Sequence, residues 1–189
     1  CSSDLNPEKT VDFIINFVNT SIIHHVENYP AEKDDFYRIN EIELEIEGIK
    51  NKQYISNSLW QCYRGSGFPV IPTLLKIMHM ALEKFLLEEC ENDNFGDVEK
   101  ILKKVLLKSK SASLTAVVTS IVLAYPDNFF DIALILFKTL DLFMYDNVRW
   151  NQESEAKSLY TIAPINRRFL IQERLDRSEE HTSELQSPG

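Results

Sequence analysis

The sequence predicts a mainly α protein, an antiparallel helical bundle or a solenoid-like set of helix pairs with one small β-hairpin. Apolar residues recur at helical spacing along most of the chain, whereas strict alternation is confined to one short stretch. The 189 residues include only 5 Gly and 7 Pro, which disfavours an all-β sandwich rich in turns. No sequence repeat of fixed period is present, so no consensus solenoid family is indicated.

The first predicted helix runs from Pro7 to about Glu27. Asn6 is a good capping residue and Pro suits the first helical position, so the pair indicates a helix start. One face of this helix carries five apolar residues at helical spacing: Val11, Ile14, Ile15, Val18 and Ile22.

A β-hairpin is predicted at residues 41–56. From Glu41 to Glu47, acidic residues alternate with three apolar ones, Ile42, Leu44 and Ile46. This is the period of a half-buried strand, and a return strand is expected around Tyr54. Glu also favours helices, so a helix over the same residues is the alternative. The row of acids could meet a basic partner, but we interpret it as a solvated strand edge.

Helical patterns dominate from Asn57 onward. The expected helices cover residues 57–64, 72–91, 97–108, 111–125, 129–140 and 141–156, and a last basic helix begins at Pro164. The second of them should bury a stripe of six residues: Leu74, Leu75, Met78, Leu82, Phe85 and Leu86. Asp97 is the expected cap of the third. No charged residue lies between Lys110 and Asp127, so we expect 111–125 to be buried nearly all round and to form a core hairpin with 129–140.

Composition excludes several classes of function. The formal net charge is −9, whereas a duplex nucleic-acid binder needs a basic surface, so no nucleic-acid partner is expected. No apolar run reaches the roughly 18–20 residues that cross a bilayer as a helix, so we expect no membrane partner. Three Cys are too few for a disulfide scaffold, and we expect a reducing, cytoplasmic location.

The end of the chain is expected to be non-native. Residues Arg177 to Ser187 resemble, without a gap, the conceptual translation of a common sequencing adapter. We therefore divide the chain into a helical segment, residues 1–176, expected to be a fragment of a larger protein, and an adapter-derived tail, residues 177–189. A natural polar tail is the alternative.

No catalytic, cofactor-binding or metal-binding signature is found in the sequence. The loop Arg64–Phe68 holds the one Gly-rich turn, but it lacks the Lys of a P-loop and the spacing of a nucleophile elbow. We interpret it as a helix end followed by a turn, and an enzyme that uses this loop is the least favoured alternative. His24, His25 and His79 lack the spacing of metal ligands and are expected to be exposed or half-buried. We expect no cofactor in this fragment.

Five residues are candidates for protein interaction because Trp, Tyr and Arg dominate binding hot spots. They are Trp60, Tyr63, Arg64, Arg149 and Trp150. The same residue types also join helices inside a core, and the sequence leaves both roles open.

Four blocks carry a resemblance to a known class of protein: Ser58–Gly65, Ala81–Glu88, Ser109–Ser120 and Asp146–Trp150. Together, over roughly residues 40–155, they resemble an interior helical segment of large bacterial ATP-binding proteins, akin to the STAND-type NTPases of antiviral defence. In such proteins a P-loop module lies elsewhere in the chain, and long helical arrays sense a ligand or transmit its binding. The resemblance implies a role as a helical sensor, scaffold or regulatory segment, and it assigns ATP binding to no residue here.

The sequence therefore favours a non-catalytic helical segment of a large multidomain NTPase, whose partners are other domains of the same chain or another protein. A stand-alone helical adaptor that binds proteins is the alternative.

Overall fold

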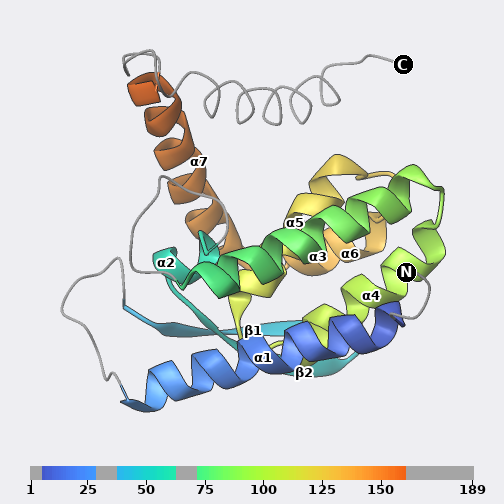
Figure 1. Ribbon diagram of the computed structural model, residues 1–189, viewed down its shortest axis with the longest axis horizontal. Coiled ribbons are helices and arrows are strands. Elements are labelled where there is room, and N and C mark those ends of the chain that lie inside the picture. Colours follow the sequence, from blue (N-terminus) through green and yellow to red (C-terminus); the bar gives the residue numbers. More distant parts are fainter. Residues whose placement is uncertain (1–5, 29–37, 63–71, 161–189) are drawn as a thin grey trace.

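The computed structural model describes residues 6–28, 38–62 and 72–160. Its elements are α1 (Pro7–Asn28), β1 (Asn40–Ile46), β2 (Ile49–Ile55), α2 (Asn57–Trp60), α3 (Thr73–Glu91), α4 (Phe95–Lys108), α5 (Ala112–Ala124), α6 (Phe130–Phe137) and α7 (Leu140–Tyr160) (Figure 1). The predicted class, mainly α with one small antiparallel hairpin, is confirmed. The predicted helix from Pro164 on and the tail 177–189 lie outside the described residues.

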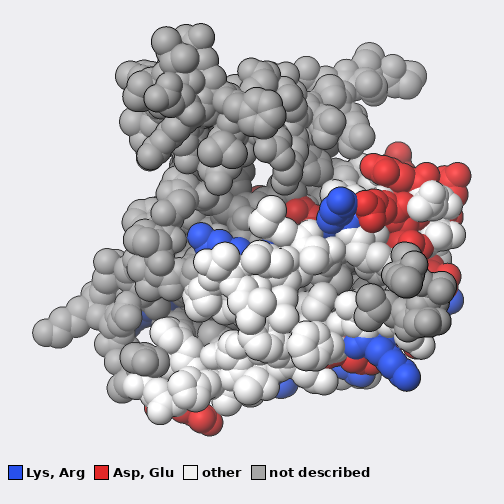
Figure 2. Space-filling model, viewed as in Figure 1, with Lys and Arg blue, Asp and Glu red and all other residues white. Residues whose placement is uncertain are grey.

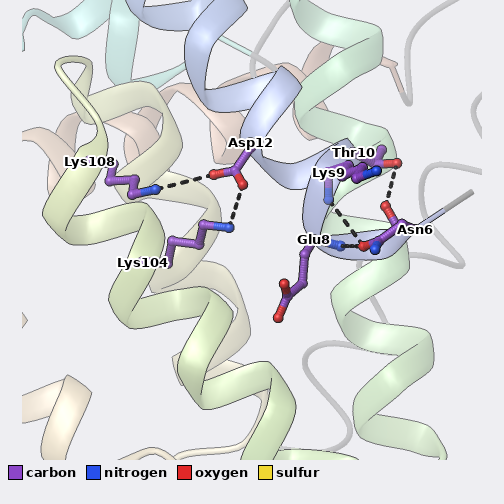
Figure 3. Close-up of polar contacts among 7 residues, drawn as sticks. All are labelled: Asn6, Glu8, Lys9, Thr10, Asp12, Lys104 and Lys108. Atoms are coloured by element: carbon purple, nitrogen blue, oxygen red, sulfur yellow. Dashed lines mark hydrogen bonds and ion pairs between the residues drawn. The ribbon is translucent and has the colours of Figure 1, made fainter.

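Helix α1 begins as the sequence predicts. The Asn6 side chain accepts hydrogen bonds from the backbone N–H groups of Glu8 (3.0 Å) and Lys9 (3.3 Å), which satisfies two of the donors that a helix start leaves free (Figure 3). All five apolar residues predicted for its inner face are buried. On the outer side, the Asp12 carboxylate pairs with Lys104 (2.8 Å) and Lys108 (3.4 Å) of α4, so α1 is held to α4 by charge as well as by packing (Figure 3).

The hairpin is confirmed, and the alternative of a helix over these residues is wrong. β1 and β2 pair antiparallel from Asn40 opposite Ile55 to Ile46 opposite Ile49. The two turn residues between them, Glu47 and Gly48, both have positive φ (51° and 80°). That geometry matches the right-handed twist of paired strands, and Gly adopts it without strain.

The two faces of the hairpin differ in charge. On the outer face, Glu43 pairs with Lys50 (2.6 Å) and Glu41 with Lys52 (3.5 Å). Glu47 reaches Lys103 of α4 at 3.0 Å. The acids of β1 are therefore largely matched within the chain, which agrees with their interpretation as a solvated strand face.

The inner face of β2 is polar, and this was not predicted. The Asn51 amide donates to the carbonyl oxygens of Leu106 (2.7 Å) and Ser109 (2.8 Å) at the end of α4. The Gln53 amide donates to the Leu106 carbonyl as well, and its oxygen accepts from Thr115 Oγ1 at 2.6 Å. Because the last carbonyls of a helix have no partner within the helix, these two buried side chains complete the end of α4.

Helix α5 is the centre of the core, as expected from its uncharged sequence. Nearly all of its residues are buried, and α3, α4, α6 and β2 all pack against it. Ser111 caps its start by accepting a hydrogen bond from the Ser113 N–H group (3.3 Å). Figure 1 shows the hairpin and α1 on one side of this assembly, while α7 leaves the helical layers and points away from them.

Several predicted details of the helices are wrong. Helix α2 ends at Trp60 rather than Arg64, and α4 begins at Phe95, so Asp97 lies in its first turn and is not its cap. The stripe of α3 is rotated, because Leu74 is exposed while His79 and Cys90 are buried. Helix α6 is only eight residues long, and α7 continues to Tyr160.

Candidate interaction surface

Three side chains from α2 and α7 meet in a partly buried cluster. The Trp60 indole N–H donates to Asp146 Oδ1 at 3.2 Å, and Arg149 Nη2 pairs with the same oxygen at 2.5 Å. The Arg149 guanidinium also lies over the Trp60 ring, 5.8 Å from its centroid. Trp60 is 0% exposed and Arg149 is 6% exposed. These two predicted interaction residues therefore join α7 to α2 and offer little surface to a partner.

Trp150 is in the opposite situation. It follows Arg149 on α7, but one residue of helix turns it about 100° away, and its side chain is 66% exposed. The structure thus separates the predicted residues into an internal pair and an exposed Trp. Tyr63, Arg64 and the loop Arg64–Phe68 lie outside the described residues.

Trp150 is one of several exposed apolar side chains on α6 and α7, and the others were not predicted. Phe130, Leu134 and Phe137 share a face of α6 at i, i+4 and i+7. The rings of Phe137 and Phe143 stack with centroids 5.1 Å apart, which connects this face to α7. We call this set of residues the α6–α7 strip; its members are 43% to 76% exposed and comprise Phe130, Leu134, Phe137, Leu140, Phe143, Met144 and Trp150.

The strip corrects the expectation of a buried core hairpin. Of the eight residues of α6, only Ile132 and Leu136 are buried: α5, α7 and β1 pack against this helix, in which every residue except Asp131 is apolar. A signal was present in the sequence. A short helix with apolar residues on every face has more apolar surface than one packing face can cover.

A serine of α5 and a histidine of α3 meet between these two helices. His79 Nδ1 lies 2.7 Å from the Leu75 carbonyl oxygen, and His79 Nε2 lies 2.8 Å from Ser113 Oγ. Because a carbonyl can only accept, Nδ1 carries the proton, and Ser113 donates to Nε2 of a neutral imidazole. Burial lowers the pKa of His79, which favours this neutral form, while the Leu75 carbonyl opposes the effect.

This Ser–His pair has the hydrogen-bond geometry of a nucleophile and its base, but it is not accessible to a substrate. Both side chains are buried, with Ser113 also bonded to Ser111 Oγ at 2.8 Å. No substrate could reach the hydroxyl without unpacking α3 from α5. We therefore assign the pair a structural role, and the expectation that His79 is exposed or half-buried is wrong.

The thiols in the described residues are also unsuited to chemistry. Burial raises the pKa of Cys62 to about 12, with Lys76 opposing, and burial together with Glu89 and Glu91 raises that of Cys90 to about 11. Both thiols are buried and free, so neither forms a thiolate at neutral pH. Within the described ranges, no group of three His, Cys, Asp or Glu side chains is placed to hold a metal.

Acidic side chains gather at the α3–α4 connection (Figure 2). They include Glu88, Glu91, Asp93 and Asp97. Glu88 pairs with Lys84 (3.6 Å) and Asp97 with Lys100 (2.7 Å), so part of this charge is matched locally. By itself the cluster indicates a solvated surface.

These observations define a mainly helical protein whose candidate site is an exposed apolar surface. No helix in the described part is long and apolar enough to cross a membrane. A scan against protein families finds no match for the chain, and neither does a search of curated proteins.

Proposed function

We propose that the chain is a non-catalytic helical scaffold or regulatory segment of a large multidomain NTPase of the antiviral-defence type, and that it acts in the cytoplasm by binding protein surfaces. The parent NTPase is proposed from the sequence resemblance. The binding role is carried by one observation, the exposed α6–α7 strip.

An apolar surface of this kind favours coverage by another protein. Seven large apolar side chains of α6 and α7 are exposed, and the stacked rings of Phe137 and Phe143 join the two helices. Monomeric proteins usually keep such patches small, because each exposed apolar group loses the hydrophobic stabilisation that burial provides. Phe, Met and Trp are also the residue types that are enriched at the centres of protein interfaces.

Titration of the full chain with Mg-ATP in a calorimeter tests the non-catalytic role. We expect no binding heat, because the sequence contains no P-loop. A measurable ATP affinity would contradict the proposal.

Sequencing of the gene around this segment tests the parent protein. The proposal predicts an in-frame P-loop module upstream. A complete gene of about this size without such a module would instead favour a stand-alone adaptor, which would use the same strip.

A further inference from the structure

The outer edge of β1 carries backbone groups that the hairpin does not use. On β2, the Tyr54 N–H group donates to the Lys110 carbonyl oxygen at 2.8 Å, so Tyr54 turns its backbone groups away from β1. In an antiparallel ladder, two opposite residues either exchange hydrogen bonds or both turn their backbone groups outward. Glu41 lies opposite Tyr54. Glu41, and with it Glu43 and Glu45 at every second position, therefore turn their N–H and C=O groups to the outer edge of β1.

This edge has no partner strand. The sheet consists of β1 and β2 alone, and Glu41, Glu43 and Glu45 are all exposed. Within the part of the chain that the structure describes, no hydrogen bond joins their backbone groups to a residue outside the hairpin. The opposite edge differs, because Tyr54 of β2 forms a bridge with Ser111. Backbone groups of this kind bond to water until the strand of another chain replaces it.

We propose that β1 binds an extended peptide strand that has Lys or Arg at alternate positions and pairs antiparallel with its outer edge. The backbone hydrogen bonds would supply affinity, and the alternate side chains would supply specificity. Directly opposite residues of an antiparallel pair have side chains on the same face, so the basic residues would lie beside Glu41, Glu43 and Glu45. The residues between them would extend the apolar face of Ile42 and Leu44. The inference depends neither on the α6–α7 strip nor on the parent NTPase.

The side chains along the edge favour a basic strand. Within the described residues, Glu45 forms no ion pair, whereas Glu43 and Glu41 pair with Lys50 and Lys52 across the hairpin. Exposed pairs of this kind contribute little to stability, so their carboxylates remain able to interact with further cations. Opposite charges placed side by side on paired strands stabilise the pairing.

The same acids oppose pairing of β1 with a second copy of itself. A two-fold symmetric antiparallel contact centred on Glu43 would bring the Glu43 residues of the two copies together and place Glu41 of each copy opposite Glu45 of the other. Like charges directly opposite each other destabilise a pair of strands. Each copy also carries a net charge of −9. The edge therefore disfavours self-association and favours a strand of opposite charge.

Binding of short peptides to the full chain at low salt tests both the backbone and the charge. The first probe is a fluorescent Lys-Val-Lys-Val-Lys-Val-Lys peptide, which matches the seven residues of β1. The second replaces every Lys by Glu. The third is N-methylated on its central Lys residues, whose N–H groups would bond to β1, and the fourth on Val residues, whose N–H groups would point away. In fluorescence anisotropy, the first and fourth should bind alike, and the second and third at least about tenfold more weakly.

Two proline variants locate the edge. Proline lacks an N–H group and is tolerated in a strand where that group would face away from the ladder. Glu43→Pro removes an N–H group from the outer edge of β1 and should weaken binding of the Lys peptide by at least about tenfold. Lys52→Pro, directly opposite on β2, removes one from the other edge and should change the affinity by less than about twofold. Circular dichroism verifies that both variants are folded.

Hydrogen exchange of the unaltered chain needs no variant. A saturating concentration of the Lys peptide should slow amide exchange at Glu41, Glu43 and Glu45, because their N–H groups gain acceptors. Exchange at Lys50 and Lys52, whose N–H groups face the other edge, should stay unchanged.

Five results would overturn the inference. They are equal binding of the Lys and Glu peptides, binding of the Lys-methylated peptide as tight as that of the Val-methylated one, equal effects of the two proline variants, and unchanged exchange at the Glu amides. The fifth is a dimer of the free chain in light scattering that Glu43→Pro abolishes, because a second copy would then occupy the edge. All of them leave the proposed non-catalytic role intact, which the Mg-ATP titration tests separately.

Discussion

Trp60, Asp146 and Arg149 show how residues typical of binding interfaces can stabilise a fold instead. The Asp146 carboxylate serves both the Trp60 N–H group and the Arg149 guanidinium, and Arg149 is almost completely buried. A buried cation costs several kcal/mol of desolvation free energy unless a partner compensates it. Asp146 is thus the residue on which the α2–α7 contact depends.

Removal of the Asp146 carboxylate should destabilise the protein more than removal of the large but exposed side chain of Trp150. We expect Asp146→Ala to lower the free energy of unfolding by about 2–3 kcal/mol, because it leaves a buried guanidinium and an indole N–H without an acceptor. Trp150→Ala should change it by less than about 0.5 kcal/mol, since Trp150 is largely exposed. Urea unfolding followed by circular dichroism measures both. Similar losses for the two variants would contradict the structural assignment.

His79 should make stability depend on pH in the mildly acidic range. Its pKa is lowered in the folded protein, so the unfolded chain binds the proton more readily. The stabilisation from neutral His79 is therefore complete above its unfolded pKa of about 6.5 and is lost as the pH falls below that value. We expect His79→Gln to be less stable than the parent at pH 7.5 but to lose less stability between pH 7.5 and pH 5.5.

Asp12 provides the control for this pH experiment. Its pKa is lowered by the hydrogen bond from Lys104, with Lys108 adding to the effect. A carboxylate with a lowered pKa stabilises the fold above its unfolded pKa of about 3.9 and loses that contribution at lower pH. The Asp12→Asn variant should therefore lose as much unfolding free energy between pH 7.5 and pH 5.5 as the parent protein does. If His79→Gln and the parent protein have the same pH dependence in that range, the assignment of His79 is wrong.

At the scale of the element, the β1–β2 turn depends on backbone geometry. Gly48 has φ +80°, a conformation that strains residues with a Cβ atom, although no atom lies within 4 Å of the position that a Cβ would take. We expect Gly48→Ala to cost about 1 kcal/mol of unfolding free energy and Gly48→Asn less, since Asn tolerates this region. Gly96→Ala, in the first turn of α4, should be neutral or stabilising by up to about 1 kcal/mol. Thermal unfolding compares the three variants, and an equal loss of unfolding free energy in all of them would contradict the explanation from backbone geometry.

Elements were predictable where the local pattern and the packing agree. The alternation of Ile42, Leu44 and Ile46 identified the hairpin, and the spacing on α1 identified all of its buried apolar residues. The polar inner face of β2 could not be predicted, because Asn51 and Gln53 look like solvent-facing residues until the end of α4 supplies their partners. His79 was missed for the same reason, since its partner Ser113 lies 34 positions away in the sequence.

At the scale of the whole molecule, the candidate site was the part least accessible to sequence reasoning. Periodicity indicates which residues are able to be buried, but it does not state whether another element is present to bury them. Seven of the eight residues of α6 are apolar, yet Phe130 and Phe137 face solvent. Conversely, Trp60 and Arg149 were candidates for protein interaction, and only the folded structure shows that they form an internal contact.

The bonds from Asn51 to the end of α4 also have a consequence for the order in which the protein matures. The hairpin is a local structure, but the carbonyl oxygens that complete its underside lie 55 and 58 positions further along the chain. During synthesis the two strands therefore emerge from the ribosome well before their acceptors do, and Tyr54 likewise awaits the Lys110 carbonyl. Asn51 and Tyr54 therefore gain these partners only after α4 and the residues that follow it have been synthesised.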